Sequence, residues 1–277
     1  YTLKYGKGSV TFALDEAHVT ELYGTPVPKI DDIRAALYAT LSSPVSHEPL
    51  ESWVNPGDKV ALIVSDMSRF WMRQDLVVPH IISYLTDKCD VNQNNITHPG
   101  GDENELRTLV TDGVYDRIRV VNHDCQAKDL VYIGTTSLGT EVRINPIAAN
   151  ADKVIMLGAC TYHVMAGYGG GRKSILPGIS GLETIRQNHL HSLDLLAPRS
   201  NPLIGNGVTD GNPLNEDMCQ AAAMVKNLFG INLVTNADMQ LAHIISGDPM
   251  KSWQLACHRV DEIYRVPIVK KAHAIIT

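Results

Sequence analysis

The chain has 277 residues, of which 44% are hydrophobic and 19% are charged, and these values are typical of a soluble globular protein with one large or two ordinary domains. The formal net charge of −6 argues against nucleic acid as the main partner, because a phosphate-binding surface is normally strongly basic. The five cysteines are dispersed and no apolar run is long enough to span a bilayer, so we expect a cytoplasmic protein with reduced thiols and no membrane partner.

The hydrophobic pattern switches repeatedly between that of strands and that of helices. In chain order it predicts a strand at residues 9–14, a helix at 31–42, a strand at 59–65, a helix at 76–88, strands at 118–122, 130–133, 142–144 and 154–157, helices at 181–191 and 216–228, strands at 231–234 and 239–246, and a helix at 252–264. The runs at 59–65 and 154–157 are almost continuously apolar, which is typical of strands buried in a parallel sheet. We therefore predict an α/β fold with a mainly parallel sheet flanked by helices.

Polar residues follow directly after one of these buried strands. Asp66 and Arg69 lie just beyond the run at 59–65. In open α/β sheets, the loops at the carboxyl ends of the strands carry the ligand contacts. Asp66 and Arg69 are therefore placed where a binding site is expected.

The most distinctive segment runs from residue 163 to residue 189 and begins H-V-M-A-G-Y-G-G-G-R-K-S-I-L-P-G. Its glycines allow positive φ, so the N–H groups of the loop can converge on an anion or a cofactor. Lys173 can serve as a charge or, when desolvated, as a nucleophile. His163 and His189 can transfer protons or bind a metal ion. The segment thus brings together the parts of a binding or catalytic site.

Two other interpretations of this loop need to be compared with that one. A phosphate-binding P-loop requires glycine immediately before its lysine, where Arg172 stands, and it opens a helix, which Pro177 and Gly178 would break. An ordinary glycine-rich surface turn is the other alternative, and composition alone does not distinguish it from a functional loop.

The run A-G-Y-G-G-G-R-K-S-I-L-P-G, with His163 ten residues before Lys173 and His189 sixteen after it, resembles the nickel-dependent lactate racemase family. Further segments agree with the resemblance, which extends over roughly residues 4–277. They are S-D-M-S-R at residues 65–69, H-P at 98–99 followed by glutamates at 103 and 105, Y-I-G-T-T-S at 132–137, and G-N-P at 211–213 leading to E-D-M at 216–218.

The resemblance implies a racemase or epimerase of a small 2-hydroxy acid that transfers a hydride to a nickel-pincer nucleotide. Lys173 would be the covalent tether of this cofactor, and His189 would be the protein ligand of nickel. Imidazole nitrogen is a suitable nickel ligand, and the spacing from Lys173 favours His189 over its neighbour His191. The cofactor also implies biosynthetic enzymes as partners, because protein side chains lack an electron sink of this kind.

The resemblance also assigns the residues around the substrate. His98 and His163 would be the two acid–base groups, one for each enantiomer. Arg69 would pair with the substrate carboxylate, unless it only forms a surface ion pair with Asp66. Asp66 and the backbone of the loop would hold the nucleotide. The loop residues concerned are Gly169, Gly170, Gly171 and Arg172.

Two segments depart from the family pattern. Family members carry an apolar strand immediately before the first catalytic histidine, whereas N-N-I-T leads directly into His98. Because a parallel sheet tolerates the loss of an inner strand poorly, we expect that a segment is absent from the given sequence before His98. Residues 269–277 look like the first strand of a second domain. We therefore predict a catalytic and cofactor-binding domain at residues 1–265 and the start of a C-terminal domain at 266–277, with the active site in the cleft between them.

Two further functions remain as alternatives. One is a zinc-dependent hydrolase that uses His98, His163 and His189, although the chain has no H-E-x-x-H motif and this function leaves Lys173 without a role. The other is a nucleotide- or cofactor-binding module without catalytic turnover.

Overall fold

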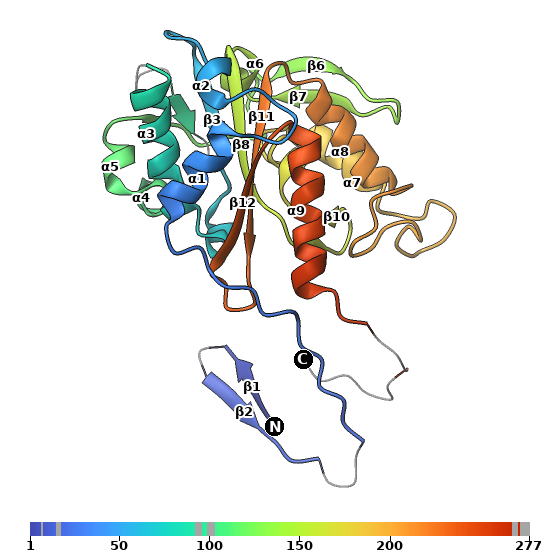
Figure 1. The fold of residues 1–277 in the computed structure, drawn as a ribbon. Helices are drawn as coiled ribbons and strands as arrows, with labels where there is room; N and C mark the ends of the chain where they lie inside the picture. Colours follow the sequence, from blue (N-terminus) through green and yellow to red (C-terminus); the bar gives the residue numbers. More distant parts are fainter. Residues whose placement is uncertain (7, 15–17, 92–95, 99–102, 268–270, 272–277) are drawn as a thin grey trace.

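A six-stranded sheet lies at the centre of the computed structural model, which describes residues 1–6, 8–14, 18–91, 96–98, 103–267 and 271 (Figure 1). In spatial order its strands are β12 (Leu241–Gly247), β11 (Leu228–Thr235), β8 (Lys153–Ala159), β3 (Val60–Ile63), β4 (Ile96–His98) and β5 (Arg119–Val120). The β12 strand runs antiparallel to β11, and the other neighbouring pairs are parallel. The prediction of a mainly parallel sheet is therefore confirmed.

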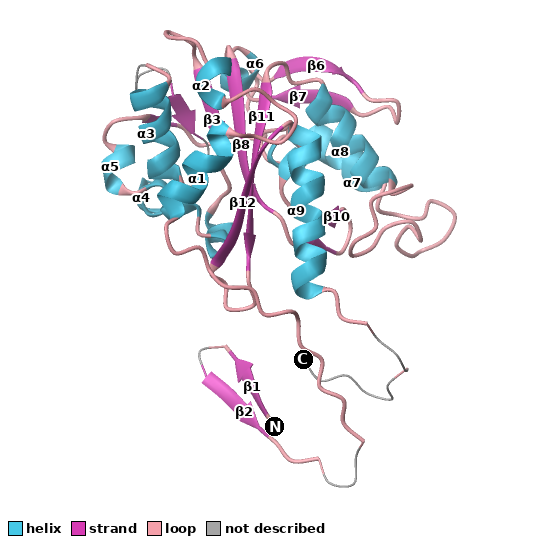
Figure 2. Ribbon diagram, viewed as in Figure 1, coloured by secondary structure: helices cyan, strands magenta, loops and turns pink. Residues whose placement is uncertain are grey.

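Helices cover both faces of this sheet, because alternate residues of each strand point to opposite faces and both sets are apolar (Figure 2). On one face, Leu62 and Ile155 belong to a core that includes residues of the first five helices. These are α1 (Ile33–Ser42), α2 (Leu50–Trp53), α3 (Val78–Lys88), α4 (Glu103–Val110) and α5 (Asp112–Tyr115). On the other face, Ala61 and Met156 pack in a core that includes residues of α6 (Pro146–Ala149) and α8 (Pro213–Ala223).

Most predicted helices and strands are found within a few residues of their expected bounds. The α1 helix begins after Asp32, whose side chain accepts a hydrogen bond from the N–H of Ala35 at 2.9 Å, as a helix N-cap does. The α8 helix begins earlier than predicted, because Asn212 caps it and Pro213 occupies its first turn. It also ends earlier, at Ala223. The α7 helix (Leu182–Leu190) and the α9 helix (Pro249–Tyr264) match their predictions closely.

The remaining strands form three small antiparallel pairs. They are β1 (Thr2–Tyr5) with β2 (Gly8–Thr11), β6 (Val131–Thr135) with β7 (Glu141–Ile144), and β9 (Tyr162–His163) with β10 (Gly167–Tyr168). Figure 1 shows the β1–β2 hairpin away from the sheet, at the end of an extended segment. The β9–β10 hairpin, in contrast, directly follows β8 and carries His163.

The inner position of the sheet at His98 is occupied by a strand, and the absence of a segment from the given sequence stays a prediction. The short β4 strand fills that position and pairs in parallel with both β3 and β5. Two β-branched residues, Ile96 and Thr97, precede His98 and suit an extended backbone, so three residues suffice to bridge the two neighbouring strands.

The strand predicted at residues 269–277 lies outside the described residues apart from residue 271, and the division into two domains stays a prediction. Among the described residues, no helix combines the length and the apolar character needed to cross a membrane.

Candidate active site

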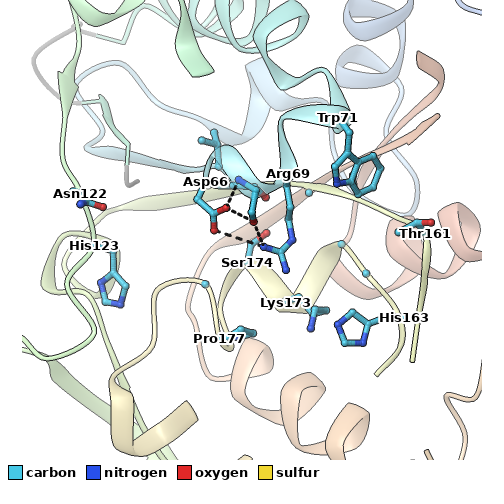
Figure 3. Close-up of a pocket in the computed structure, with 18 residues that line it drawn as sticks. Asp66, Arg69, Trp71, Asn122, His123, Thr161, His163, Lys173, Ser174 and Pro177 are labelled. Atoms are coloured by element: carbon cyan, nitrogen blue, oxygen red, sulfur yellow. Dashed lines mark hydrogen bonds and ion pairs between the residues drawn. The ribbon is translucent and has the colours of Figure 1, made fainter. Parts of the chain in front are cut away.

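A cavity of about 540 Å³ opens at the carboxyl ends of the parallel strands (Figure 3). Segments that follow β3, β5 and β8 line it, together with the glycine loop, as the rule for open α/β sheets predicts. Its polar lining groups are Ser65, Asp66, Ser68, Arg69, Asn122, His123, Thr161, His163, Lys173 and Ser174. Of the predicted site residues, the structure thus brings together Asp66, Arg69, His163 and Lys173, along with Gly169 and Gly170.

The glycine loop packs closely on the end of β8 and on Trp253. This packing requires glycine at two positions of the loop and at one position of β8. A Cβ on Gly170 would lie 3.0 Å from the carbonyl oxygen of Ala159, and one on Gly158 would lie 3.0 Å from the Cα of Gly170. A Cβ on Gly171 would come within 2.7 Å of the Trp253 ring. Side chains at these positions would lift the loop from the strand, so the glycines set how deeply it is seated.

Three N–H groups of the loop form hydrogen bonds inside the protein, whereas we expected the N–H groups of the loop to converge on the cavity. The N–H of Gly169 donates to the carbonyl of Thr161 at 2.8 Å. The N–H of Gly171 donates to the buried side chain of Asn232 at 3.1 Å, and that of Lys173 to the carbonyl of Gly170 at 3.2 Å. Because these donors are already used inside the protein, an anion in the cavity must be bound mainly by side chains.

Arg172 lies in the protein interior and does not line the cavity. Its side chain is fully buried, and its Nη2 and Nη1 donate to the carbonyls of Ala166 at 2.8 Å and Tyr168 at 3.1 Å. Its Nε donates to the Oδ1 of Asn215 at 2.9 Å, and the guanidinium lies 3.7 Å from the ring centroid of Trp253. Arg172 therefore ties together the carbonyl groups of the loop, and its side chain is not placed to contact a nucleotide in the cavity.

Lys173 follows in the 3₁₀ helix Gly171–Ser174, and its side chain reaches the cavity next to His163 (Figure 3). Burial, and then the positive charges of Arg172 and Arg69, lower the pKa of Lys173 to about 7. Both causes disfavour the ammonium form. Near neutral pH, about half of the protein molecules therefore carry Lys173 as a free amine, which is the nucleophilic form.

His163 lies on β9, and its ring is held by the turn of its own hairpin. Its Nδ1 accepts hydrogen bonds from the N–H groups of Met165 and Ala166, both at 3.2 Å. Because Nδ1 accepts, the neutral ring carries its proton on Nε2. Burial, and then the positive charges of Lys173 and Arg69, lower the pKa of His163 to about 4, so the ring is neutral at physiological pH.

Asp66 and Arg69 belong to the 3₁₀ helix Met67–Met72 and its N-cap. Asp66 caps this helix by accepting from the N–H of Ser68 at 2.8 Å, and its carboxylate lies 3.6 Å from the Arg69 guanidinium. The surface ion pair that we considered is thus present, but Arg69 also lines the cavity. The fully buried Gln74 fixes this loop, because its amide both donates to and accepts from the backbone of Ser65.

His189 and His191 have different surroundings on α7 and just after it. The Nδ1 of His189 lies 2.9 Å from the carbonyl oxygen of Ile185 and must donate to it, which leaves the Nε2 lone pair free for a metal ion. The Nε2 of His191 instead lies 4.0 Å from the fully buried carboxylate of Asp217, which also accepts a hydrogen bond from Asn188. His191 therefore belongs to the polar contact between α7 and α8.

His189 does not line the cavity. Among the described residues, there is no group of three or more His, Cys, Asp or Glu side chains that could hold a metal ion. For His98 the structure describes the backbone at the end of β4, and its side chain lies outside the described part. The backbone of His98 is thus at the same edge of the sheet as the cavity, because β3, β4 and β8 run parallel.

Sequence reasoning missed several residues that shape the cavity. His123 lines it and uses both ring nitrogens for hydrogen bonds, to the carbonyl of Ser180 at 2.9 Å and to the side chain of Asn145 at 3.2 Å. It is therefore part of the cavity wall. The roles of Gln74 and Asn232 also went unnoticed, since Gln74 stands between the charged Arg73 and Asp75 and the only signal for Asn232 was a polar residue inside an apolar strand.

The fold and the cavity define an α/β protein with a lysine of lowered pKa at the carboxyl edge of a parallel sheet. The chain matches the lactate racemase N-terminal domain family over residues 5–199. It belongs to this family.

Comparison with known proteins agrees with this assignment. The chain is 26% identical to the lactate racemase of Thermoanaerobacterium thermosaccharolyticum over 288 aligned residues and to that of Lactiplantibacillus plantarum over 285. Each alignment covers 99% of this chain but only 65% and 66%, respectively, of the two relatives. The chain thus spans about two thirds of the length of these relatives.

The fold is also that of a solved family member. The structure of the lactate racemase apoprotein from T. thermosaccharolyticum superposes with a TM-score of 0.85 at 24% identity, over 96% of this chain and 63% of that one. A protein from Thermotoga maritima superposes with a TM-score of 0.64 at 17% identity, over 83% of this chain and 59% of that one. These similarities confirm the α/β fold.

Proposed function

We propose that this chain carries the cofactor-binding and acid–base residues of a 2-hydroxyacid racemase or epimerase similar to lactate racemase. The observation that carries the proposal is the amine of Lys173, whose pKa of about 7 leaves it reactive, in one cavity with the neutral His163 and with Arg69. A structural lysine has no need of this environment. The family membership and the two lactate racemase relatives support the same reaction class.

The residues present fit a nickel-pincer nucleotide tethered to the protein. A thioamide forms when an unprotonated amine condenses with a thiocarboxylic acid and the C–O bond breaks with loss of water, and the surroundings of Lys173 favour the unprotonated amine. The hydrogen bond from Nδ1 of His189 to Ile185 fixes the tautomer that has a free Nε2, as is usual for metal-binding histidines. When bound, the cofactor supplies the electron sink that accepts a hydride from C2 of the substrate.

The residues of the chain would bind the substrate and move its protons. Arg69 is half-exposed at the cavity and offers a planar guanidinium to the substrate carboxylate, in place of its weak contact with Asp66. The neutral His163 offers its Nε2–H to the oxygen on C2. It can take up a proton at Nδ1 only by giving up two long hydrogen bonds to the backbone. His98, at the end of β4, would be the second acid–base group.

Substrate labelled with deuterium at C2 tests this proposal. With the full-length, cofactor-loaded protein, we expect racemisation with a primary isotope effect and a product that keeps most of its label, because a hydride does not exchange with water. His163→Ala and His98→Ala should each slow turnover by about 10²–10⁴, the usual cost of losing a general acid–base group. Chiral chromatography and mass spectrometry measure both results. Complete exchange of C2 hydrogen with solvent would reject the hydride reaction, and no turnover by the loaded protein would favour a binding module.

The role of His189 can be tested separately from turnover. In the loaded protein, His189→Ala should lose most of its nickel while the organic adduct on Lys173 persists, because the tether does not involve the imidazole. His191→Ala is the matched control and should retain nickel, since its ring faces Asp217. Elemental analysis and intact mass give the two readouts. The reverse pattern would assign the metal to His191.

A further inference from the structure

One face of α9 holds the segment that carries His163 and Lys173. Trp253, Cys257 and Asp261 are spaced by four residues and so lie along one side of this helix. The Nε1 of Trp253 donates to the carbonyl of Gly169 at 2.9 Å, and the Sγ of Cys257 lies 3.6 Å from that of Cys160. Asp261, one helical turn after Cys257, contacts the β9–β10 hairpin. Along its length, α9 thus contacts first the glycine loop, then the end of β8 and finally the β9–β10 hairpin.

Asp261 joins the two strands of the hairpin through a single carboxylate oxygen. The hydroxyl groups of Tyr162 on β9 and Tyr168 on β10 each donate to Oδ1 of Asp261, both at 2.7 Å. The two residues are direct partners in the ladder, and their ring centroids lie 5.4 Å apart. Arg265 is the other charged neighbour of Asp261, but its Nη1 lies 4.0 Å from Oδ2 of Asp261 and its side chain is 77% exposed. The two tyrosines are therefore the main partners of Asp261.

The hairpin geometry connects this contact to the active site. Tyr162 and His163 are consecutive in β9, so their side chains point to opposite sides of the strand. Tyr162 is held against α9 on one side, while His163 faces the cavity on the other. A displacement or rotation of the hairpin would therefore move the imidazole directly.

We propose that Asp261 is a positioning residue for His163, because it clamps both strands of the His163 hairpin to α9. The catalytic consequence rests on the proposed function, but the positioning itself does not. The interaction is strong enough to act as a clamp, because both bonds are charge-assisted. Burial and the hydrogen bond to Asp261 raise the pKa of Tyr162 to about 12, so both phenols remain donors at any physiological pH.

Titration of the His163 ring by NMR tests the clamp in the apoprotein. The wild-type signal, assigned by comparison with His163→Gln, should show little titration between pH 5 and 8, because burial and the cations Lys173, Arg69, Arg172 and the nearby His189 all depress the pKa of His163. In Asp261→Ala the released hairpin admits water, and we expect the His163 midpoint to rise by about one unit or more, into this range. Loss of the Asp261 charge acts in the opposite direction, so a rise reports movement of the ring.

Two further variants separate the clamp from general effects. Asp261→Asn keeps an acceptor oxygen for both phenols and should restore the wild-type titration, and Glu262→Ala, whose side chain pairs with the exposed Arg259 on the same helix, should leave it unchanged. An unchanged His163 signal in Asp261→Ala, or equal shifts in Asp261→Ala and Glu262→Ala, would overturn the proposal. If Asp261→Ala does not fold, the double variant Tyr162→Phe/Tyr168→Phe removes the same two hydrogen bonds and must raise the midpoint.

In the loaded enzyme, Asp261→Ala should lower kcat by about ten- to a hundredfold, the cost of a small misplacement of a catalytic group, while KM changes little. Asp261→Asn should recover most of kcat. A raised His163 midpoint without any loss of kcat would contradict the assigned role of His163 in catalysis and would leave the structural clamp intact. The NMR and kinetic results therefore distinguish failure of the clamp from failure of the proposed function.

Discussion

At pH 7, brief acylation of the apoprotein should modify Lys173 about a hundred times faster than the lysine of a short model peptide in the same sample, because a peptide lysine with a pKa near 10.4 is neutral in fewer than about one molecule in a thousand. Lys173 is about half neutral at this pH, since burial and the neighbouring arginines lower its pKa to about 7. The neutral fractions of the two amines differ by more than the expected hundredfold ratio of acylation rates. The rates differ less because a less basic amine is also a weaker nucleophile. Peptide mass spectrometry with a small acylating reagent measures both rates.

The pH dependence of the acylation rate also distinguishes Lys173 from an ordinary lysine. The rate at Lys173 should rise between pH 6 and 7 and level off above pH 8, once the amine is mostly neutral. The rate at the lysine of the model peptide should continue to rise towards pH 10. In protein produced together with the cofactor-making enzymes, Lys173→Ala should abolish both the covalent nucleotide and racemisation. Equal labelling of Lys173 and the peptide lysine at pH 7, or a cofactor adduct on Lys153 or Lys226, would reject Lys173 as the tether.

Replacement of Arg172 should produce the largest loss of stability in the chain. Arg172→Met leaves the carbonyls of Ala166 and Tyr168 and the amide of Asn215 without their buried donor, and it removes the stacking on Trp253. We expect the free energy of unfolding to fall by about 3–5 kcal/mol, because each buried acceptor left without its donor costs about 1–3 kcal/mol. Urea denaturation of the apoprotein measures this change.

Conservative and control variants show whether the fork geometry of Arg172 matters. Arg172→Lys keeps the charge but cannot reach the same acceptors with a planar fork, so most of the loss should remain. Arg186→Met, at an exposed position with a weak ion pair to Glu183, should change stability by less than about 0.5 kcal/mol. A stable Arg172→Met protein that has lost only nucleotide binding would instead restore the direct cofactor contact that we first expected of this residue.

The architecture was largely predictable because it depends on local patterns. Continuous apolar runs predicted β3 and β8 as buried strands, and the rule that ligands bind at the carboxyl ends of parallel strands placed Asp66 and Arg69 at the cavity. Prediction failed where the pattern was short. The pattern predicted no strand at residues 96–98, because β4 has only three residues and its neighbours in the sheet supply its hydrogen bonds.

The sequence by itself determined the α/β pattern, the position of the glycine loop and the spacing of His163, Lys173 and His189 that resembles the lactate racemase family. These properties depend on residues close together in the chain. Only the tertiary structure decided that Arg172 turns inward, that the N–H groups of the loop are already used, and that Asp261 holds the His163 hairpin. Arg172 meets Asn215 across 43 positions, and Asp261 meets Tyr162 across 99, so these partners come together only when the sheet and α9 have assembled. The lowered pKa of Lys173 has the same origin, because desolvation depends on everything packed around a group and not on its neighbours in sequence.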